Sequence, residues 1–371
     1  MTLRIGILGA AKIAGSFMVG AKASSRAAVV AIASRDRDRA DAFARQHGIP
    51  RAYGYADLLA DREVDAIYNP LPNSLHAAWS IAAARAGKHV LCEKPLAVSE
   101  AEARTMFAAA DAHGVVLVEA FPYMFQPQTL EIERLIASGA IGEVRTMFGA
   151  FGFTISDPAN IRLDAQLGGG AVMDAGCYPV SLARQVFGVR PERVTAIARW
   201  HSGVDQTLAT TLEYPGGGIA QISCSFATAV HRRAIIAGTL GVIDTDYHNH
   251  TDRVTAPSFR IKRSADWQAE FETVPVPSEN GFRAELDAFT EMIEREDRAA
   301  VKARRAASLD NAWTLAAILD SARRCIHMAG SPIPDAGYSD AARQTWATTT
   351  ASSAGAPHGS GSRAVCPARS I

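Results

Sequence analysis

The first third of the chain alternates short apolar runs with longer helix-like segments. The apolar runs are rich in Val, Ile, Leu and Ala and occur at Leu3–Leu8, Ala28–Ala33, Ala66–Tyr68, His89–Cys92 and Val115–Val118. Continuous apolar strands that alternate with helices are typical of a parallel sheet covered by helices on both faces. The sequence therefore predicts an N-terminal α/β domain, a doubly wound Rossmann sheet, at residues 1–121.

The first predicted strand runs directly into a turn of small residues and then into a helix start. This turn reads Gly9-Ala10-Ala11-Lys12-Ile13-Ala14. In a dinucleotide fingerprint, the first small residue makes the turn, the second lets the backbone approach the pyrophosphate, and the third allows close helix packing. Backbone N–H groups at the helix start then face the negative charge. A plain strand-turn-helix is the alternative, but the position at the front of a βαβ pattern favours a dinucleotide site.

The second predicted strand ends in Ser34-Arg35-Asp36, where an NAD-preferring domain presents an acid to the ribose 2′-OH. Ser34 can donate to a 2′-phosphate and Arg35 can bind it bidentately, whereas a carboxylate would repel it. NADP is therefore the expected cofactor. NAD stays possible, because Asp36 could still bind a 2′-OH within a solvated run of alternating charges.

After Phe121 the pattern changes to longer strands joined by turns. These strands are expected at Glu143–Ile155, Arg193–Trp200, Gln206–Tyr214 and Ile219–Phe226, and Pro215–Gly218 reads as a hairpin turn between the last two. Helices are expected at Phe282–Glu296 and Ser308–Met328. Residues 122–335 are thus predicted to form an α+β domain on a large open, mainly antiparallel sheet. The small polar residues of 336–371 predict a disordered tail.

The composition excludes several function classes. Lys plus Arg (38) equals Asp plus Glu (38), so no global charge attracts nucleic acid or an anionic membrane. The five cysteines contain no C-x-x-C pair, which indicates neither a disulfide framework nor a zinc site, and no metal site is expected. No apolar run reaches membrane-spanning length, and no signal peptide precedes the first strand. We expect a cytoplasmic protein.

A charged pair at the end of a buried strand is the most specific signal in the chain. Glu93-Lys94-Pro95 follows His89–Cys92, and ligands of doubly wound sheets bind outside the carboxyl ends of the strands. The Lys94-Pro95 bond is also a candidate for the cis form. A second segment, Pro70-Leu71-Pro72-Asn73-Ser-Leu-His76, follows the preceding strand.

With these motifs and the segment Gly168–Tyr178, the chain resembles the Gfo/Idh/MocA oxidoreductases from Gly6 to about Gly330. It most resembles the branch containing NADP-dependent D-xylose 1-dehydrogenase and dimeric dihydrodiol dehydrogenase. The resemblance implies that Lys94 reaches the substrate oxygen and the nicotinamide ribose. It also implies a cofactor contact for the following residues: Pro70, Leu71, Asn73, His76, Glu93 and Pro95. For His76, packing at a helix start is the alternative.

Asp174 and Tyr178 lie four residues apart and share a face of a predicted helix, Ala171–Phe187. Pro179 cannot donate its backbone N–H, so this helix should kink or begin anew near Tyr178. The resemblance makes Tyr178 the acid/base, with Lys94 as the cation that lowers its pKa, and Asp174 a group that holds a substrate hydroxyl or orients Lys94. The alternative is a capping Asp174 and a half-buried Tyr178.

One departure from the family pattern concerns the segment after Phe121. The branch carries an Arg and a His in a Tyr-Arg-Phe-His-Pro run, whereas this chain reads Tyr123-Met124-Phe125-Gln126-Pro127. Either the substrate is less polar or less negative than a sugar ligand, or a group such as Arg162 substitutes. Tyr123 and Arg162 are therefore weaker candidates for substrate contact.

The expected activity is NADP(H)-dependent hydride transfer to or from a sugar, polyol or related cyclic alcohol. Two alternatives remain: redox-neutral chemistry on a tightly held cofactor, as in an epimerase or glycosidase, and a non-catalytic NADP(H)-binding sensor. The alternate small residues Thr207, Ala209 and Thr211 suit flat contact between sheets, and relatives of this kind dimerise through that sheet. We expect a homo-oligomer, a dimer or tetramer.

Overall fold

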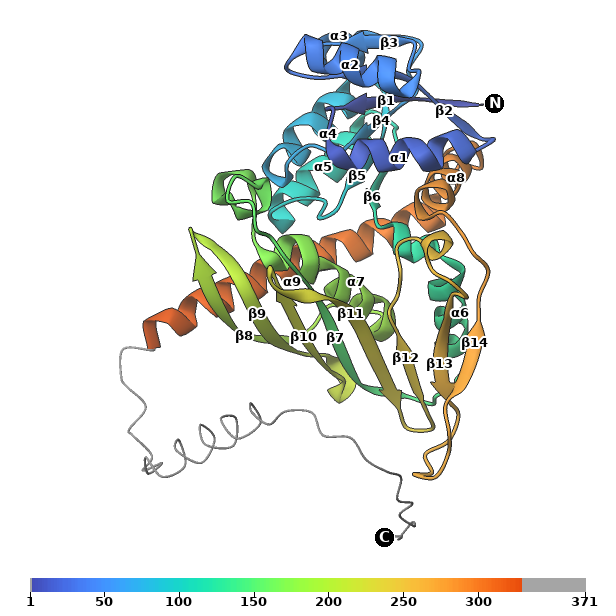
Figure 1. The fold of residues 1–371 in the computed structure, drawn as a ribbon, viewed down its shortest axis with the longest axis vertical. Helices are drawn as coiled ribbons and strands as arrows, with labels where there is room; N and C mark the ends of the chain where they lie inside the picture. Colours follow the sequence, from blue (N-terminus) through green and yellow to red (C-terminus); the bar gives the residue numbers. More distant parts are fainter. Residues whose placement is uncertain (1, 329–371) are drawn as a thin grey trace, which may run out of the picture. The chain divides into compact units, whose positions relative to one another are not determined.

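The computed structural model describes residues 2–328 and contains two β-sheets, each with its own helices (Figure 1). The predictions for 336–371 lie outside the described residues. The first sheet is entirely parallel, with the order β3-β2-β1-β4-β5-β6. Its strands are β1 (Leu3–Leu8), β2 (Ala27–Ala33), β3 (Arg51–Tyr53), β4 (Ala66–Asn69), β5 (His89–Glu93) and β6 (Leu117–Ala120). The doubly wound sheet predicted from the apolar runs is confirmed.

The helices of this part connect successive strands. They are α1 (Lys12–Ala23), α2 (Arg37–His47), α3 (Tyr55–Ala60), α4 (His76–Arg85) and α5 (Glu100–Ala112). Side-chain caps define two of their starts: the Asp36 carboxylate accepts from the first turn of α2, and Ser99 accepts from Glu102 in α5. The strand order reverses between β1 and β4, and this reversal opens a crevice at their carboxyl ends.

The second sheet has eight strands in the order β14-β13-β12-β11-β7-β10-β9-β8. They are β7 (Val144–Thr154), β8 (Arg193–His201), β9 (Val204–Glu213), β10 (Ile219–Ser225), β11 (Ala227–Gly238), β12 (Val242–Thr245), β13 (Ser258–Lys262) and β14 (Glu272–Pro275). All neighbours are antiparallel except β7 and β10, which are parallel. The predicted mainly antiparallel sheet is confirmed, and it extends four strands beyond Phe226.

Four helices accompany this sheet: α6 (Pro127–Ala137), α7 (Cys177–Phe187), α8 (Gly281–Glu294) and α9 (Arg298–Met328). Contacts of α7 and α9 with the strands cover one face of the sheet. Pro179 of α7 lies against Gly149 of β7, and the Ser321 hydroxyl of α9 accepts from the Ala196 amide of β8 at 3.0 Å. The opposite face retains exposed apolar side chains, among them Phe148 and Ile197.

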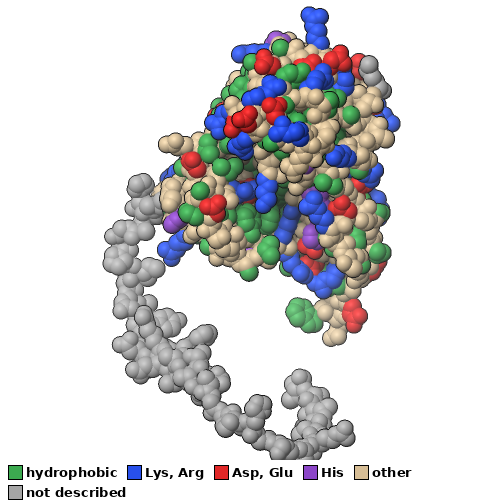
Figure 2. Space-filling model, turned by 45° about the horizontal axis from the view of Figure 1, so that its top comes forward, with side chains coloured by type: hydrophobic (Ala, Val, Ile, Leu, Met, Phe, Trp, Pro, Cys, Tyr) green, Lys and Arg blue, Asp and Glu red, His purple; other side chains and the backbone are tan. Residues whose placement is uncertain are grey.

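The surface carries charges of both signs. Figure 2 shows Lys and Arg side chains interspersed with Asp and Glu over the visible face. This distribution agrees with the balanced composition. No helix within residues 2–328 is long and apolar enough to span a membrane.

Candidate active site

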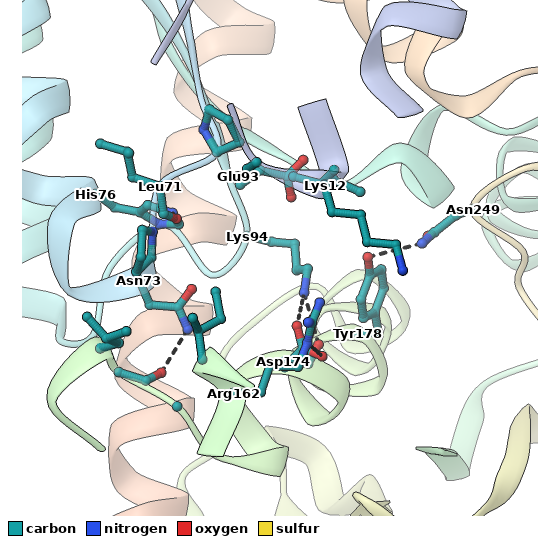
Figure 3. A pocket seen from close by; sticks show the side chains of 18 of the residues that line it. Lys12, Leu71, Asn73, His76, Glu93, Lys94, Arg162, Asp174, Tyr178 and Asn249 are labelled. Atoms are coloured by element: carbon teal, nitrogen blue, oxygen red, sulfur yellow. Dashed lines mark hydrogen bonds and ion pairs between the residues drawn. The ribbon is translucent and has the colours of Figure 1, made fainter. Parts of the chain in front are cut away.

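A cavity of about 320 Å³ lies at the carboxyl ends of β1, β4 and β5. Each strand leads directly into a lining segment: Ala11–Ile13 after β1, Pro70–Asn73 after β4, and Lys94 after β5. The other wall comes from the second sheet and its connections, including Phe151. Arg162, Asp174 and Tyr178 also belong to this wall (Figure 3). This is the crevice in which open α/β sheets bind their ligands.

Lys94, Asp174 and Arg162 form a charged cluster in the cavity. The Asp174 carboxylate accepts from Lys94 Nζ at 2.9 Å through Oδ1 and from Arg162 Nε at 2.7 Å through Oδ2. Burial disfavours the ionised Asp174, but the two cations outweigh it and hold the pKa of the carboxyl below its ordinary value. Burial also opposes the charge on Lys94, yet Asp174 and Tyr178 together raise the pKa of that amine. The lysine is therefore a fixed cation.

Asp174 reaches this position because the chain changes helical geometry ahead of Pro179. Residues Val172–Gly176 form a π-helical turn, and the α-helix α7 begins at Cys177. Pro179 has no backbone N–H to continue a regular ladder, so a local change of hydrogen bonding is expected here. The predicted change near Tyr178 is confirmed, and it brings both Asp174 and Tyr178 to the cavity.

Tyr178 is almost fully enclosed, with its hydroxyl at the cavity wall. Asn249 Nδ2 donates to the phenol oxygen at 3.0 Å, and Lys94 Nζ lies 5.0 Å from the ring centroid. Burial raises the pKa of Tyr178 to about 12, while Lys94 and Arg232 oppose this rise. Lys94 thus lowers the pKa of Tyr178 as predicted, but its ammonium also pairs with Asp174, and desolvation of the phenolate is the larger effect.

The small-residue turn predicted to bind the pyrophosphate lies between β1 and α1, and its residues Ala11, Lys12 and Ile13 line the cavity. Gly9 has φ +99°, a conformation that favours glycine, and a Cβ there would approach Leu71 to 3.0 Å. No side chain caps the first turn of α1, which leaves the N–H groups of Lys12 and Ile13 free to meet an anion. Lys12 itself extends into the cavity from α1 (Figure 3). Ala10 follows Gly9 but does not line this cavity.

Ser34 and Arg35, the predicted contacts of a 2′-phosphate, follow β2. Gly9 N–H donates to Ala33 O at 2.7 Å, so Ser34 and Arg35 follow directly beside the turn. The Asp36 carboxylate accepts from the backbone N–H groups of Asp38 and Arg39 as the cap of α2. The Ser34 hydroxyl accepts from the Asp36 N–H at 3.3 Å, and the contact of Ser34 and Arg35 with a 2′-phosphate stays a prediction.

The segment Pro70–His76, to which the family resemblance assigns cofactor contacts, is held by hydrogen bonds from side chains to backbone carbonyl oxygens. His76 is fully buried, and its ring nitrogens bond the carbonyl oxygens of Pro95 at 2.9 Å and Leu71 at 2.7 Å. Both ring nitrogens are therefore occupied and join the turns after β4 and β5. His76 also lines the cavity, so its contact with the cofactor stays a prediction. Asn73 Nδ2 donates to Gly168 O at 2.8 Å and so joins the turn after β4 to the Gly168–Gly170 loop.

Glu93 and Pro95 flank Lys94 in different ways. Glu93 lines the cavity and accepts from the Tyr68 hydroxyl, and burial raises the pKa of its carboxyl. Pro95 follows a cis peptide bond, and its ring lies outside the cavity lining. Pro70 and Leu71 line the cavity as predicted.

Tyr123 does not reach the cavity, which corrects its prediction as a substrate contact. It lies in the 3-10 turn Pro122–Phe125, is fully buried, and shares a 2.7 Å hydrogen bond with the Ser181 hydroxyl. The turn directs the ring into the core between α7 and the second sheet, where it lies 5.8 Å from the Tyr247 ring. Arg162, the other weaker candidate, does line the cavity.

Several lining residues carried no sequence signal. Asn249 and His250 come from the segment between β12 and β13, which contains no recognised motif. His250 Nδ1 accepts from Gly281 N–H at 3.1 Å, and burial lowers its pKa to about 4, so the ring is neutral. The apolar lining was also not predicted; it comprises Pro122, Phe151, Phe153, Ile161, Leu167 and Phe282. Their separation along the chain hides them from any local pattern.

Two family models match this chain. Residues 3–121 match an oxidoreductase family with an NAD-binding Rossmann fold, and residues 129–244 match the GFO/IDH/MocA C-terminal domain. The chain belongs to the GFO/IDH/MocA oxidoreductase family. Among curated proteins, the chain is similar to D-xylose 1-dehydrogenase (NADP(+)) 2 of Haloferax volcanii, to which it is 39% identical over 86% of this chain and 97% of that protein.

Two further proteins are similar to this chain. Trans-1,2-dihydrobenzene-1,2-diol dehydrogenase of Mus musculus is 37% identical over 65% of this chain and 74% of its own length. The structure of KijD10, a 3-ketoreductase from Actinomadura kijaniata in complex with NADP and TDP-benzene, is 29% identical, with a TM-score of 0.78 over 86% of this chain and 98% of that one. The resemblance predicted from the motifs is confirmed, and the chain is a dehydrogenase or reductase of this family.

Proposed function

We propose that this protein transfers hydride between NADP(H) and the hydroxyl or carbonyl carbon of a sugar, polyol or related cyclic alcohol. The observation that carries the proposal is the convergence of Lys94, Asp174 and Tyr178 in one cavity beside the small-residue turn. A phenol, a fixed ammonium and a dinucleotide site within one cavity are the groups that such a reaction needs.

The phosphate-side residues support NADP as the cofactor. The open N–H groups at the start of α1 fit a pyrophosphate. Ser34 and Arg35 fit a 2′-phosphate, and the Asp36 carboxylate is occupied by the cap of α2. The relative named D-xylose 1-dehydrogenase (NADP(+)) adds support for this cofactor. When bound, NADP(H) supplies or accepts the hydride at the nicotinamide.

The chain's own residues handle the proton and the substrate oxygen. The Tyr178 phenol is protonated at neutral pH, so it can donate its proton to a carbonyl oxygen that becomes a hydroxyl. Lys94, held by Asp174, offers a further N–H to the same oxygen and stabilises the negative charge that develops on it. In the oxidation direction the same phenol, ionised, accepts the proton of the substrate hydroxyl.

The two walls of the cavity support a cyclic substrate with one polar edge. Phe151, Phe153 and Phe282 form apolar lining, whereas Asp174 and Arg162 present charged groups. A ring whose hydroxyls meet the charged groups can place its C–H face on the aromatic side. Relatives named as a xylose dehydrogenase and as dihydrodiol dehydrogenases support this class.

The proposal is tested with a panel of substrates, and the reaction of each is measured by the absorbance of the reduced nicotinamide. The panel contains aldoses, inositols, anhydro-sugars and dihydrodiols, each assayed with NADP and with NAD. We expect at least one member of the panel to reduce NADP faster than NAD. Absence of reduction with every member, or cofactor that copurifies and never exchanges, would contradict the proposal and favour the sensor or redox-neutral alternative.

The cofactor preference has a separate test at Arg35. Replacing Arg35 with Ala removes the guanidinium that faces the 2′-phosphate. We expect the dissociation constant of NADP to rise by about tenfold or more, since a charge-assisted bond contributes roughly 1.5–3 kcal/mol. Binding of NAD, measured by the same fluorescence titration, should change far less. Equal loss for both nucleotides would contradict the assignment of Arg35 to the phosphate.

A further inference from the structure

Arg232 of β11 places a guanidinium among aromatic rings behind the candidate active site. Its central carbon lies 4.3 Å from the Tyr247 ring centroid, 4.5 Å from Tyr178 and 5.0 Å from Phe151. Within residues 2–328 no ion pair joins Arg232 to a carboxylate, and its Nε has no hydrogen-bond partner. The cation is therefore compensated mainly by ring faces rather than by an acid.

A hydrogen-bonded amide connects this cation to the Tyr178 hydroxyl. Arg232 Nη2 donates to Asn249 Oδ1 at 3.3 Å, and Asn249 Nδ2 donates to the Tyr178 oxygen at 3.0 Å. The two bonds fix which end of the amide faces which group, because the guanidinium has no acceptor to offer. Since the phenol oxygen accepts from Asn249, its own O–H is left to donate elsewhere. The Tyr178–Asn249 bond lies at the cavity wall (Figure 3).

Tyr178 thus has a cation on either side. Lys94 Nζ lies 5.0 Å from the ring centroid on the cofactor-domain side, and Arg232 lies 4.5 Å from it on the side of the second sheet. Arg232 comes from β11, a strand with no recognised motif.

We propose that Arg232 is a positioning residue that acts through Asn249, aiming the Tyr178 O–H into the cavity and stabilising the ionised phenol from the sheet side. The inference rests on the proposed acid/base role of Tyr178. It assigns a second cation to the reaction, outside the Lys94, Asp174 and Arg162 cluster.

The charges around Tyr178 agree with this role. Burial raises the pKa of the phenol, and Lys94 and then Arg232 oppose that rise. Loss of Arg232 leaves Lys94 as the main opposing cation. The titratable and charged groups that face Tyr178 or Arg232 from the packed elements are Lys94, Glu93, Asp174, Cys177, Arg162, Tyr68, Tyr123, Tyr247 and His250.

The proposal is tested by titrating Tyr178 itself. The full-length protein is labelled with 3-fluorotyrosine, whose ortho fluorine makes the phenol more acidic, and Tyr178→Phe assigns the fluorine resonance. We expect Arg232→Met to raise the pH at which this resonance titrates by about one pH unit, equal to about tenfold less phenolate. Arg232→Lys keeps a cation and should recover part of this change.

A matched control comes from the next residue on the strand. The Arg233 side chain faces away from Tyr178 and pairs with Asp244, which also pairs with Arg260. Arg233→Gln should therefore leave the Tyr178 titration unchanged. If Arg232→Met does not fold, Asn249→Ala breaks the same connection and should also raise the titration midpoint. A midpoint equal to wild type in folded Arg232→Met and Asn249→Ala would overturn the proposal.

Turnover separates this inference from the proposed function. We expect Arg232→Met to lower kcat about tenfold while the KM for NADPH is unchanged. If Tyr178 is not the acid/base, Tyr178→Phe keeps its turnover, and the proposed function fails. If Arg232 does not act on Tyr178, the fluorine titration is unmoved while Tyr178→Phe is still inactive.

Discussion

Tyr178 keeps its proton at neutral pH because desolvation outweighs two neighbouring cations, and the pKa of the phenol rises to about 12. A group whose pKa is raised stays in its acid form up to that value. The direction of catalysis that needs the acid should therefore be insensitive to pH through the neutral range. The direction that needs the phenolate should depend on pH.

The raised pKa of Tyr178 predicts a different pH profile for each direction of the reaction. Carbonyl reduction should hold a constant kcat/KM from neutral into mildly alkaline pH. Alcohol oxidation should instead rise by up to about tenfold per pH unit, because the phenolate fraction rises with pH below the pKa. Steady-state kinetics in both directions measure this. An oxidation rate that falls as pH increases, in a protein that stays folded, would contradict the assignment.

The sequence could predict the residues that share a motif or a helix face. Lys94 follows a buried strand, and the family resemblance marks Asp174 and Tyr178, which lie four residues apart. The sequence therefore predicts all three residues, and all three line the cavity. Arg232 and Asn249 could not be found in this way, since they are brought to Tyr178 by strand pairing and a loop between β12 and β13. The dominance of burial over the Lys94 charge also depends on packing.

Among the elements, strands with regular apolar patterns were the predictable ones. The strand expected at Leu3–Leu8 is β1 to the residue. Strand β11 was missed because His231-Arg232-Arg233 interrupts its apolar pattern, and β12 and β14 have only four residues each. Strand β6 begins two residues after its predicted start at Val115. Partners far along the chain complete these strands, and no local pattern contains that information.

Helices α1 and α8 make a close element-to-element contact that connects the Rossmann part with the second part. A Cβ at Gly20 of α1 would lie 2.6 Å from the Arg283 amide nitrogen and 2.6 Å from Phe282 Cβ. We expect Gly20→Ala to destabilise the fold by about 1–3 kcal/mol, since the helix backbones must separate. Thermal unfolding should show a lower Tm.

Gly15 on the same helix is the matched control for Gly20. Its added Cβ would meet nothing closer than 3.8 Å, in the His47 ring. Gly15→Ala should therefore be neutral or stabilising by about 0.5–1 kcal/mol, because alanine is the better helix former. Equal Tm values for the two variants would show that the α1–α8 contact is not close in solution.

The face of the eight-stranded sheet that is not covered by α7 and α9 carries exposed apolar side chains. Ile197 is 67% exposed and Phe148 45% exposed, and Phe148 pairs across strands with Ile235 on the same face. Flat apolar sheet faces of this kind are covered in stable proteins. We propose that two copies pack through this face, as expected from the small alternate residues of β9.

Sedimentation velocity tests the proposed dimer. The wild-type protein should sediment as a dimer or a multiple of it, and Ile197→Lys should shift it to the monomer, since a charge is costly to bury in such a contact. Leu240, 57% exposed in the turn between β11 and β12, provides the control. Leu240→Lys should not change the sedimentation coefficient. A monomeric wild-type protein would contradict the proposal.

We propose that Lys94 and Tyr178 carry out the chemistry of a site that binds NADP(H) mainly through other residues. Turnover and NADPH binding in Lys94→Ala test this proposal. We expect kcat to fall by about two orders of magnitude or more while the dissociation constant of NADPH, measured by fluorescence titration, changes by only a few fold. A Lys94→Ala enzyme with near wild-type turnover would contradict the proposal.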